Sequence, residues 1–162
     1  MRTITPIFLL VIIGLGCKKE ANRKALNAYF KYTVNGTEIN ITPGILHNDK
    51  LFDCRFVGDT ALQIVVSKAY NGAGIFVTDL SGIRDGAYVL NGKNKAYYLH
   101  PADQKKYVTT AVASGIVHIT RSTLQSKDLL KTLQGTFEYT SIDTLTGKKF
   151  EITNGAFLME YK

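Results

Sequence analysis

The sequence has few cysteines and lacks the short motifs that mark most enzymes and cofactor-binding proteins. Only Cys17 and Cys54 occur among its 162 residues, which is too few for a disulfide framework. The HExxH, GxSxG, CxxC, phosphate-loop, dinucleotide-binding and calcium-loop patterns are all missing. We therefore expect no catalytic residue, no metal site and no cofactor.

Histidines are also few, and they are scattered. His47, His100 and His118 lie far apart in the sequence, whereas a zinc site needs three or four convergent ligands. We interpret His47 and the nearby Asp49 as parts of a solvated loop. His118 alternates with Ile116 in a strand-like pattern, which indicates an interfacial side chain and not a base.

The apolar run near the N-terminus is too short to be a transmembrane helix. Thr3–Gly16 has fourteen uncharged residues behind Arg2, whereas a helix that crosses a bilayer needs about 20. Such a run is typical of the hydrophobic region of an export signal, and we expect residues 1–16 to be a signal peptide.

The end of this run resembles the lipobox of bacterial lipoproteins. Gly16 precedes Cys17, although Gly14 stands where a leucine is usual. The resemblance implies that Cys17 carries acyl chains such as palmitate and anchors the protein in membrane lipid. Lys18 stands where an aspartate would favour inner-membrane retention, so the resemblance implies the outer membrane. Ordinary secretion is the alternative.

The rest of the chain is expected to be one domain with an excess of basic charge. Residues 17–27 read as a tether and residues 28–162 as a single antiparallel β domain. The whole chain has 20 Lys and Arg against 13 Asp and Glu, a net charge of +7, and loss of Arg2 with the signal peptide would leave +6. In an exported protein this excess favours anionic glycans or lipid headgroups as partners over nucleic acid, or serves only solubility.

Four Asn-Gly pairs punctuate the sequence, and two of them predict β-hairpins with a consistent register. A two-residue turn at Asn35-Gly36 would place apolar residues on one face. A turn at Asn154-Gly155 would do the same. The residues predicted to face the core are Phe30, Tyr32, Ile39 and Ile41 in the first hairpin, and Phe150, Ile152, Phe157 and Met159 in the second.

The other two Asn-Gly pairs give weaker signals. A turn at Asn71-Gly72 would pair Val66 with Val77 but Ile64 with Asp79, and Asn91-Gly92 is interpreted as part of a longer loop. The segment 122–133 has leucines near helical spacing, so it is either a short helix or a crossover loop.

Short segments rich in β-branched and aromatic residues fill most of the remaining chain. Further strands are expected at 51–57, 61–68, 74–80, 86–90, 95–100, 106–112, 115–121 and 135–142. The predicted fold is therefore all-β, an antiparallel β-sandwich or small flattened barrel. In the first of these strands Cys54 alternates with Phe52 and Phe56, which indicates a small core side chain.

One segment combines lysines with aromatic residues. Between residues 93 and 107, four lysines and three tyrosines accompany a single acid, Asp103. Aromatic rings stack on sugars and ammonium groups attract anions, so we expect a ligand contact with Tyr98 exposed and Tyr97 in the core. The alternative is that the tyrosines are core residues and the lysines a solvated edge. The candidate contact residues are Lys93, Lys95, Tyr98, Lys105 and Lys106.

Three motifs lie in the C-terminal half: Gly115–Thr120, Gly135–Phe137 and Ile152–Phe157. They resemble a family of small uncharacterised lipoproteins from Bacteroidota, and "FKYTVNGTEI" resembles the family's first hairpin. These motifs consist of turns and core aromatics, so the resemblance implies an all-β fold and no catalytic residues.

Together these features predict a lipid-anchored outer-membrane protein that binds or scaffolds a partner at the cell envelope without catalysis. The partner would be an anionic glycan or an envelope protein. Two alternatives stay open, a small hydrolase or lyase acting on glycans and a structural subunit of an envelope complex.

Overall fold

The structure is a computed structural model, and it describes residues 27–43, 50–68, 71–109, 114–123 and 131–161. The predicted signal peptide and all but the last residue of the tether, together with Cys17, His47 and Asp49, lie outside the described residues. Within the described ranges the chain forms strands and no helix. The strands are β1 (Tyr29–Val34), β2 (Thr37–Ile41), β3 (Lys50–Val57), β4 (Ala61–Lys68), β5 (Asn71–Thr78), β6 (Gly86–Leu90), β7 (Lys95–Leu99), β8 (Lys106–Val108), β9 (Gly115–Thr123), β10 (Lys131–Ile142) and β11 (Lys149–Glu160).

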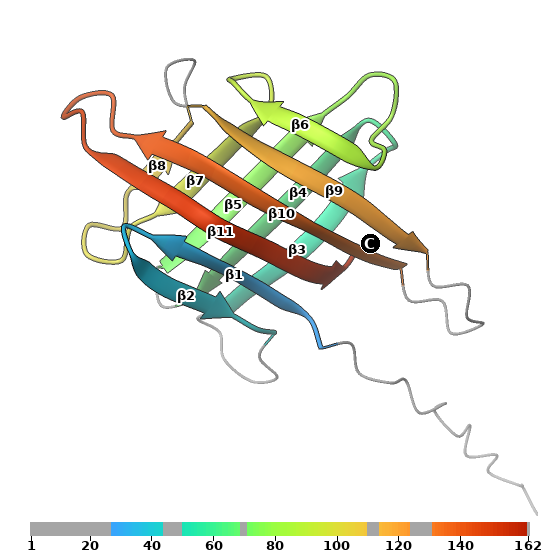
Figure 1. Ribbon diagram of the computed structural model, residues 1–162, viewed down its shortest axis with the longest axis horizontal. Helices are drawn as coiled ribbons and strands as arrows, with labels where there is room; N and C mark the ends of the chain where they lie inside the picture. The colour runs from blue at the N-terminus through green and yellow to red at the C-terminus, as the bar shows by residue number, and fades with distance from the viewer. Residues whose placement is uncertain (1–26, 44–49, 69–70, 110–113, 124–130, 162) are drawn as a thin grey trace, which may run out of the picture.

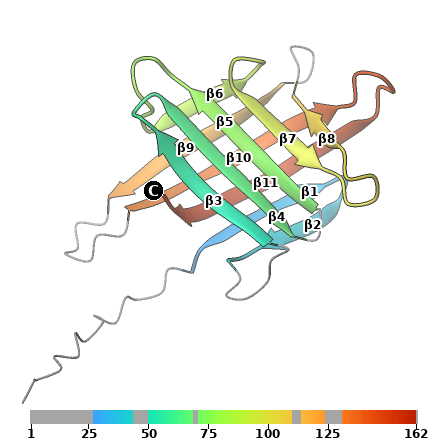
Figure 2. The same cartoon turned by 180° about the vertical axis from the view of Figure 1, so that it is seen from behind.

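The strands form one antiparallel sheet folded into two layers. The first layer has the order β2-β1-β11-β10-β9-β6, and the second has the order β8-β7-β5-β4-β3. Figure 1 shows the first layer in front, and Figure 2 shows the second from the opposite side. Strand β10 joins the layers, because it pairs with β9 along most of its length and with β8 at its end. The sheet is not closed: β2 and β3 end its main path, and β6 ends the branch that runs through β9. The prediction of an all-β sandwich or flattened barrel is confirmed.

An aromatic core fills the space between the layers. Phe30 is fully buried, and its ring stacks on Phe137 with centroids 4.8 Å apart and on Phe157 with centroids 6.2 Å apart. Burial of each such side chain contributes about 1.5–3 kcal/mol. In the opposite layer β4 alternates strictly, with Leu62 and Ile64 facing this core.

Two tyrosine hydroxyls cross between the layers and satisfy polar atoms within the core. Tyr32 in β1 donates to Asn71 Oδ1 at the start of β5 over 2.9 Å. Tyr139 in β10 donates to the Tyr97 carbonyl in β7 over 2.7 Å. Burial raises the pKa of both phenols, so each hydroxyl stays protonated and available as a donor.

The first predicted hairpin is confirmed. The register pairs Phe30 with Ile41 and Tyr32 with Ile39, and the turn residues Asn35 and Gly36 have φ values of 45° and 84°. Asparagine and glycine tolerate this left-handed conformation, which a two-residue hairpin turn requires.

The second predicted hairpin is wrong, because Asn154-Gly155 lies inside the continuous strand β11. The neighbouring strand places only Glu138 opposite Thr153 and Asn154, which makes this site a β-bulge. Asn154 has a φ of 52°. The bulge shifts the alternation of inward and outward side chains by one residue. The predicted turn would have placed the same residues on one face, so Ile152 and Phe157 still face the core.

Three further local predictions are corrected or refined. Asn71-Gly72 is not the turn between β4 and β5, since Lys68 pairs with Asn71 and Ile64 pairs with Ile75. Asn91-Gly92 lies in the connection between β6 and β7, as expected. For the segment 122–133, the helical alternative is wrong at both ends, because residues 122–123 belong to β9 and residues 131–133 belong to β10. Residues 124–130 lie outside the described part of the chain.

The core position of Cys54 is confirmed. Its side chain is buried, and Phe52 and Phe56 on the same strand are partly buried against the core. Burial raises the pKa of the Cys54 thiol to about 12, which leaves it protonated and weakly reactive at neutral pH.

Four glycines lie directly opposite aromatic residues on paired strands. A Cβ at Gly135 would lie 2.2 Å from the His118 carbonyl oxygen and 2.6 Å from the Phe157 ring. Because glycine has no side chain, the ring of the facing residue can pack directly against the backbone. The pairs are Gly135 with Phe157, Gly155 with Phe137, Gly115 with Tyr139 and Gly74 with Tyr97.

Candidate binding surfaces

The structure reverses the expected orientation of the two tyrosines in β7. Tyr98 is 3% exposed and packs in the core, with its ring 5.0 Å from that of Phe150. Tyr97 points to the opposite side of the sheet. The expectation of an exposed Tyr98 is therefore wrong. Tyr97 is buried too, at 9% exposed, but it lies outside the core cluster. The correct signal was present, because Lys95 and Tyr97 are two residues apart and so share a strand face.

Tyr97 forms part of a basic and aromatic patch on the outer side of the second layer. Its ring lies over Gly74, where a Cβ would be 2.1 Å from the ring, and is stacked 5.9 Å from Phe76. The Lys106 ammonium lies 5.0 Å from the centre of the Tyr97 ring. Lys95 is exposed and pairs with Phe76 across the strands. We call Phe76, Lys95, Tyr97 and Lys106 the β7 outer surface.

The other two predicted lysines lie beyond opposite ends of β7. Lys93 precedes the strand, and its charge helps to lower the pKa of Asp79. Lys105 precedes β8, and its charge helps to lower the pKa of Asp143. Since β7 is five residues long at about 3.3 Å per residue, roughly 13 Å of strand separates these two ends. The structure thus brings Lys95 and Lys106 to one face but does not gather all four lysines.

A polar cluster around Asp103 was missed by sequence reasoning. Tyr107 donates to Asp103 Oδ2 over 2.5 Å, and Lys148 Nζ lies 3.9 Å from the same oxygen. His100 Nδ1 lies 3.3 Å from Asp103 Oδ1 but forms no hydrogen bond of good geometry. The Lys148 ammonium also lies 4.9 Å from the centre of the Phe150 ring.

The hydrogen bond from Tyr107 is the main reason why the pKa of Asp103 falls to about 2, and the same bond raises the pKa of Tyr107 to about 12. The carboxylate is therefore ionised. It accepts hydrogen bonds from Tyr107 and the Lys105 amide within the β7–β8 region, and it lies close to Lys148 in the hairpin between β10 and β11. This cluster is interpreted as a loop clamp. Lys148 is 45 residues further along the chain than Asp103, so no local pattern could reveal this contact.

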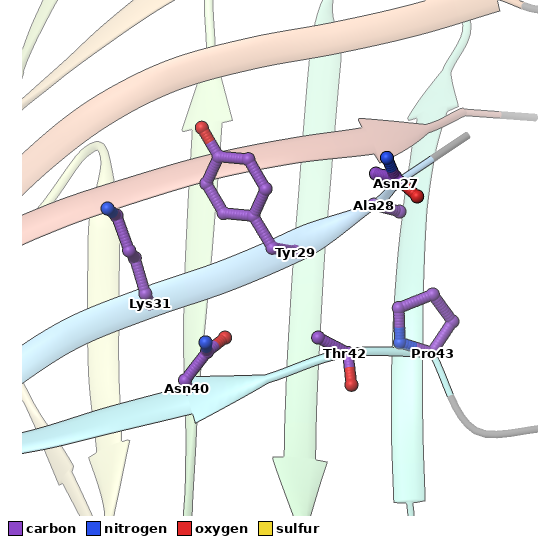
Figure 3. Close-up of a pocket in the computed structure, with 7 residues that line it drawn as sticks. All are labelled: Asn27, Ala28, Tyr29, Lys31, Asn40, Thr42 and Pro43. Carbon is purple, nitrogen blue, oxygen red and sulfur yellow. The ribbon is translucent and has the colours of Figure 1, made fainter.

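The outer side of the first layer carries three shallow hollows. The first has a volume of about 510 Å³ and is lined by Tyr29, Lys31, Asn40 and neighbouring residues. Figure 3 shows Tyr29 and Lys31 projecting from β1, with Asn40 on the adjacent β2. The Lys31 ammonium lies 5.8 Å from the centre of the Tyr29 ring. Two more hollows, of about 500 Å³ and 380 Å³, lie over β9, β10 and β11.

Within the described ranges, no group of three or more His, Cys, Asp and Glu side chains could hold a metal ion. The two described histidines are apart, since His100 belongs to the Asp103 cluster and His118 is exposed on β9. In the same part of the chain no helix has the length and apolarity needed to cross a membrane.

Comparison with known proteins identifies the family. No curated protein and no solved structure matches the chain. The family model described as "Domain of unknown function (DUF6252)" matches residues 54–159, from β3 to the end of β11. That range includes the three motifs noted in the C-terminal half, whereas the β1–β2 hairpin lies outside it. Because the match covers more than half of the sequence, the chain belongs to the DUF6252 family.

Proposed function

We propose that the protein is a lipid-anchored outer-membrane lipoprotein that binds an anionic glycan without catalysing a reaction. Cys17 carries the acyl chains, and the folded domain presents the β7 outer surface to the glycan. On this proposal the protein is one of the Bacteroidota lipoproteins that its motifs resemble.

The placement of Lys106 over Tyr97 supports the proposal. The ammonium lies 5.0 Å from the ring centre, and exposed Lys95 belongs to the same face. Tyr97 is only 9% exposed, with Gly74 under its ring and the Lys106 ammonium over it, so it positions that ammonium. The half-buried Phe76 ring beside it can contact the C–H face of a sugar, while the two ammonium groups attract carboxylate or sulfate substituents.

The test is binding to anionic polysaccharides such as alginate, polygalacturonate and heparin. The Lys95→Gln/Lys106→Gln variant should lose most of the binding of the parent protein. Binding by the parent should weaken as NaCl rises from about 0.05 M to about 0.5 M, because exposed charges are screened.

A matched control removes the same charge elsewhere. Lys131→Gln/Lys149→Gln changes two exposed lysines on β10 and β11 in the other layer, and it should bind as the parent does. Equal losses in the two double variants would show that only net charge matters, which would overturn the assignment of the surface.

One observation favours a glycan hydrolase or lyase as a second candidate. Glu138 and Glu151 line the same hollow of about 380 Å³, and glycosidases use two carboxylates about 5–10 Å apart. This candidate predicts release of reducing ends from a polysaccharide, abolished in Glu138→Gln. Binding without any product would exclude it.

A structural role in an envelope complex is the third candidate. Such a role would need one contiguous apolar patch, whereas among the described residues the large exposed apolar side chains lie on separate elements: Val57, Leu80, Val89, Val108 and Leu145. Crosslinking in intact cells followed by purification would reveal a constant protein partner if this role is correct.

A further inference from the structure

We propose that the outer side of the first layer holds a second binding site, a trough for a neutral, hydroxyl-rich oligosaccharide. This site goes beyond the proposed function, because it lies on the other layer and would bind a ligand without charge. It crosses β2, β1, β11, β10 and β9, and we call it the first-layer trough.

The three hollows on this side adjoin one another, because neighbouring hollows share lining residues. Lys31 lines both the hollow over β1 and β2 and the adjoining hollow of about 500 Å³. Ile116 and Glu138 line both this second hollow and the third. Five strands at about 4.8 Å spacing extend over roughly 19 Å. The trough can therefore hold an extended chain of several units, whereas each hollow alone is open and shallow.

The β-bulge in β11 explains why the trough exists here. Glu138, where two of the hollows meet, faces the bulge residues Thr153 and Asn154. A bulge interrupts the ladder, bends its strand and redirects side chains, and bulges occur often beside functional sites. Beside the bulge, Ala156 is the small residue between Lys31 on β1 and Thr136 on β10.

The lining offers hydrogen-bonding groups of both kinds and one aromatic ring. Amides and hydroxyls predominate, and they can pair with sugar hydroxyls as donors and acceptors. Tyr29, half-buried at one end, provides a ring against which a sugar can pack. The amide and aliphatic hydroxyl residues are Asn27, Asn40, Thr42, Ser114, Thr136, Thr140, Thr153 and Asn154.

The charges in the trough argue against an anionic ligand. Lys31 is the cation of the lining, and it is accompanied by Glu138 and Glu151. A polyanion would meet these two carboxylates, which repel it. A strand-like peptide is disfavoured too, because it would add to a free sheet edge, whereas β1, β11, β10 and β9 already have a neighbouring strand on both sides. A neutral oligosaccharide fits the mixture of groups.

The test is affinity electrophoresis of the purified full chain, in detergent, through gels that contain laminarin, galactomannan, xyloglucan or dextran. At least one of these neutral polysaccharides should retard the protein. Tyr29→Ala should weaken the retardation by about tenfold, because it removes the aromatic ring that packs on the sugar, whereas Tyr29→Phe keeps the ring and should retain it. Glu138→Gln should also weaken binding.

Two controls separate this site from the β7 outer surface. Lys95→Gln/Lys106→Gln should leave neutral binding unchanged, and binding should persist at about 0.5 M NaCl because no net charge drives it. The inference is overturned if none of the four polymers retards the protein, or if Tyr29→Ala and Glu138→Gln bind as the parent does. If the parent protein binds neutral polysaccharides but no anionic ones, the proposed function is wrong and the inference about the trough still holds.

Discussion

At the scale of single residues, Phe157 shows how the core depends on exact shape. It is 1% exposed, faces Gly135 across the strands and stacks against Phe30. The Phe157 ring occupies the space that a side chain at residue 135 would need. Neither residue can change alone without creating a cavity or a clash.

Phe157→Ala should lower the free energy of unfolding by about 3–5 kcal/mol, because it removes a buried ring and leaves a cavity. Glu160→Ala, on the solvent side of the same strand, should change it little. Urea unfolding followed by circular dichroism measures both, which suits a chain that has no tryptophan. Equal small effects would contradict the core assignment.

Asp103 allows a prediction about pH. Its pKa in the folded protein is about 2, below the ordinary 3.8, so the ionised carboxylate stabilises the fold. This contribution is present above about pH 4 and is lost as the pH falls towards 2. Asp103→Asn should therefore be less stable than the parent at neutral pH, with the difference vanishing near pH 2.

The cause of this shift can be checked separately. Tyr107→Phe removes the hydrogen bond that lowers the pKa of Asp103 most, so the pKa should rise towards 3.8 in an NMR titration. Tyr88→Phe removes a hydroxyl that bonds the Arg84 backbone instead, and it should leave the pKa of Asp103 unchanged. A Tyr107→Phe titration identical to that of the parent would contradict the assigned cause.

At the scale of elements, the bulge in β11 determines the face of every residue after it. The buried residues are even-numbered before Asn154 and odd-numbered after it, as Ile152 and Phe157 illustrate. A one-residue change in register moves all later side chains to the other face. The bulge is therefore required for both halves of β11 to contribute to the core.

Deletion of Asn154 should abolish cooperative folding, because it would turn Phe157 and Met159 towards solvent. Asn154→Gly should be tolerated, since glycine adopts the left-handed φ of 52° readily. Asn154→Val should cost roughly 1–2 kcal/mol, because a β-branched residue is strained there. Thermal unfolding distinguishes the three, and a deletion variant as stable as the parent would contradict the bulge.

At the scale of the whole molecule, the two layers present two chemically different outer sides. The second layer carries the β7 outer surface, with exposed cations beside aromatic rings. The first layer carries the trough, where Lys31 accompanies two carboxylates. On our proposals the molecule meets charged and neutral glycans on opposite sides of one core.

The proposed anchor gives a prediction for the intact protein. Cys17→Ser should leave an unprocessed or released precursor, because the acyl chains of Cys17 provide the proposed attachment to the membrane. Labelling with radioactive palmitate and fractionation of membranes measure this directly. Palmitate still incorporated into the Ser variant would defeat the lipoprotein assignment, whereas Cys54→Ser should leave labelling unchanged.

The sequence by itself determined the strands and much of the core. Alternation of apolar residues depends only on the period of two along a strand, so the segment around Cys54 could be assigned to a core face before its neighbours were known. The Asn35-Gly36 turn is likewise local, because backbone preferences of two adjacent residues specify it. These features need no knowledge of distant pairing.

Only the tertiary structure decided the features that depend on distant partners. A shift in alternation at Asn154 fits a turn and a bulge equally, and the pairing of β11 with β1 and β10 selects the bulge. Tyr97 and Tyr98 are adjacent and both buried, and the packing of Tyr98 against Phe150 shows which of them lies in the core between the layers. Asp103 meets Lys148 because two hairpins come together at one end of the layers. Such contacts join residues far apart in the chain, and no local period encodes them.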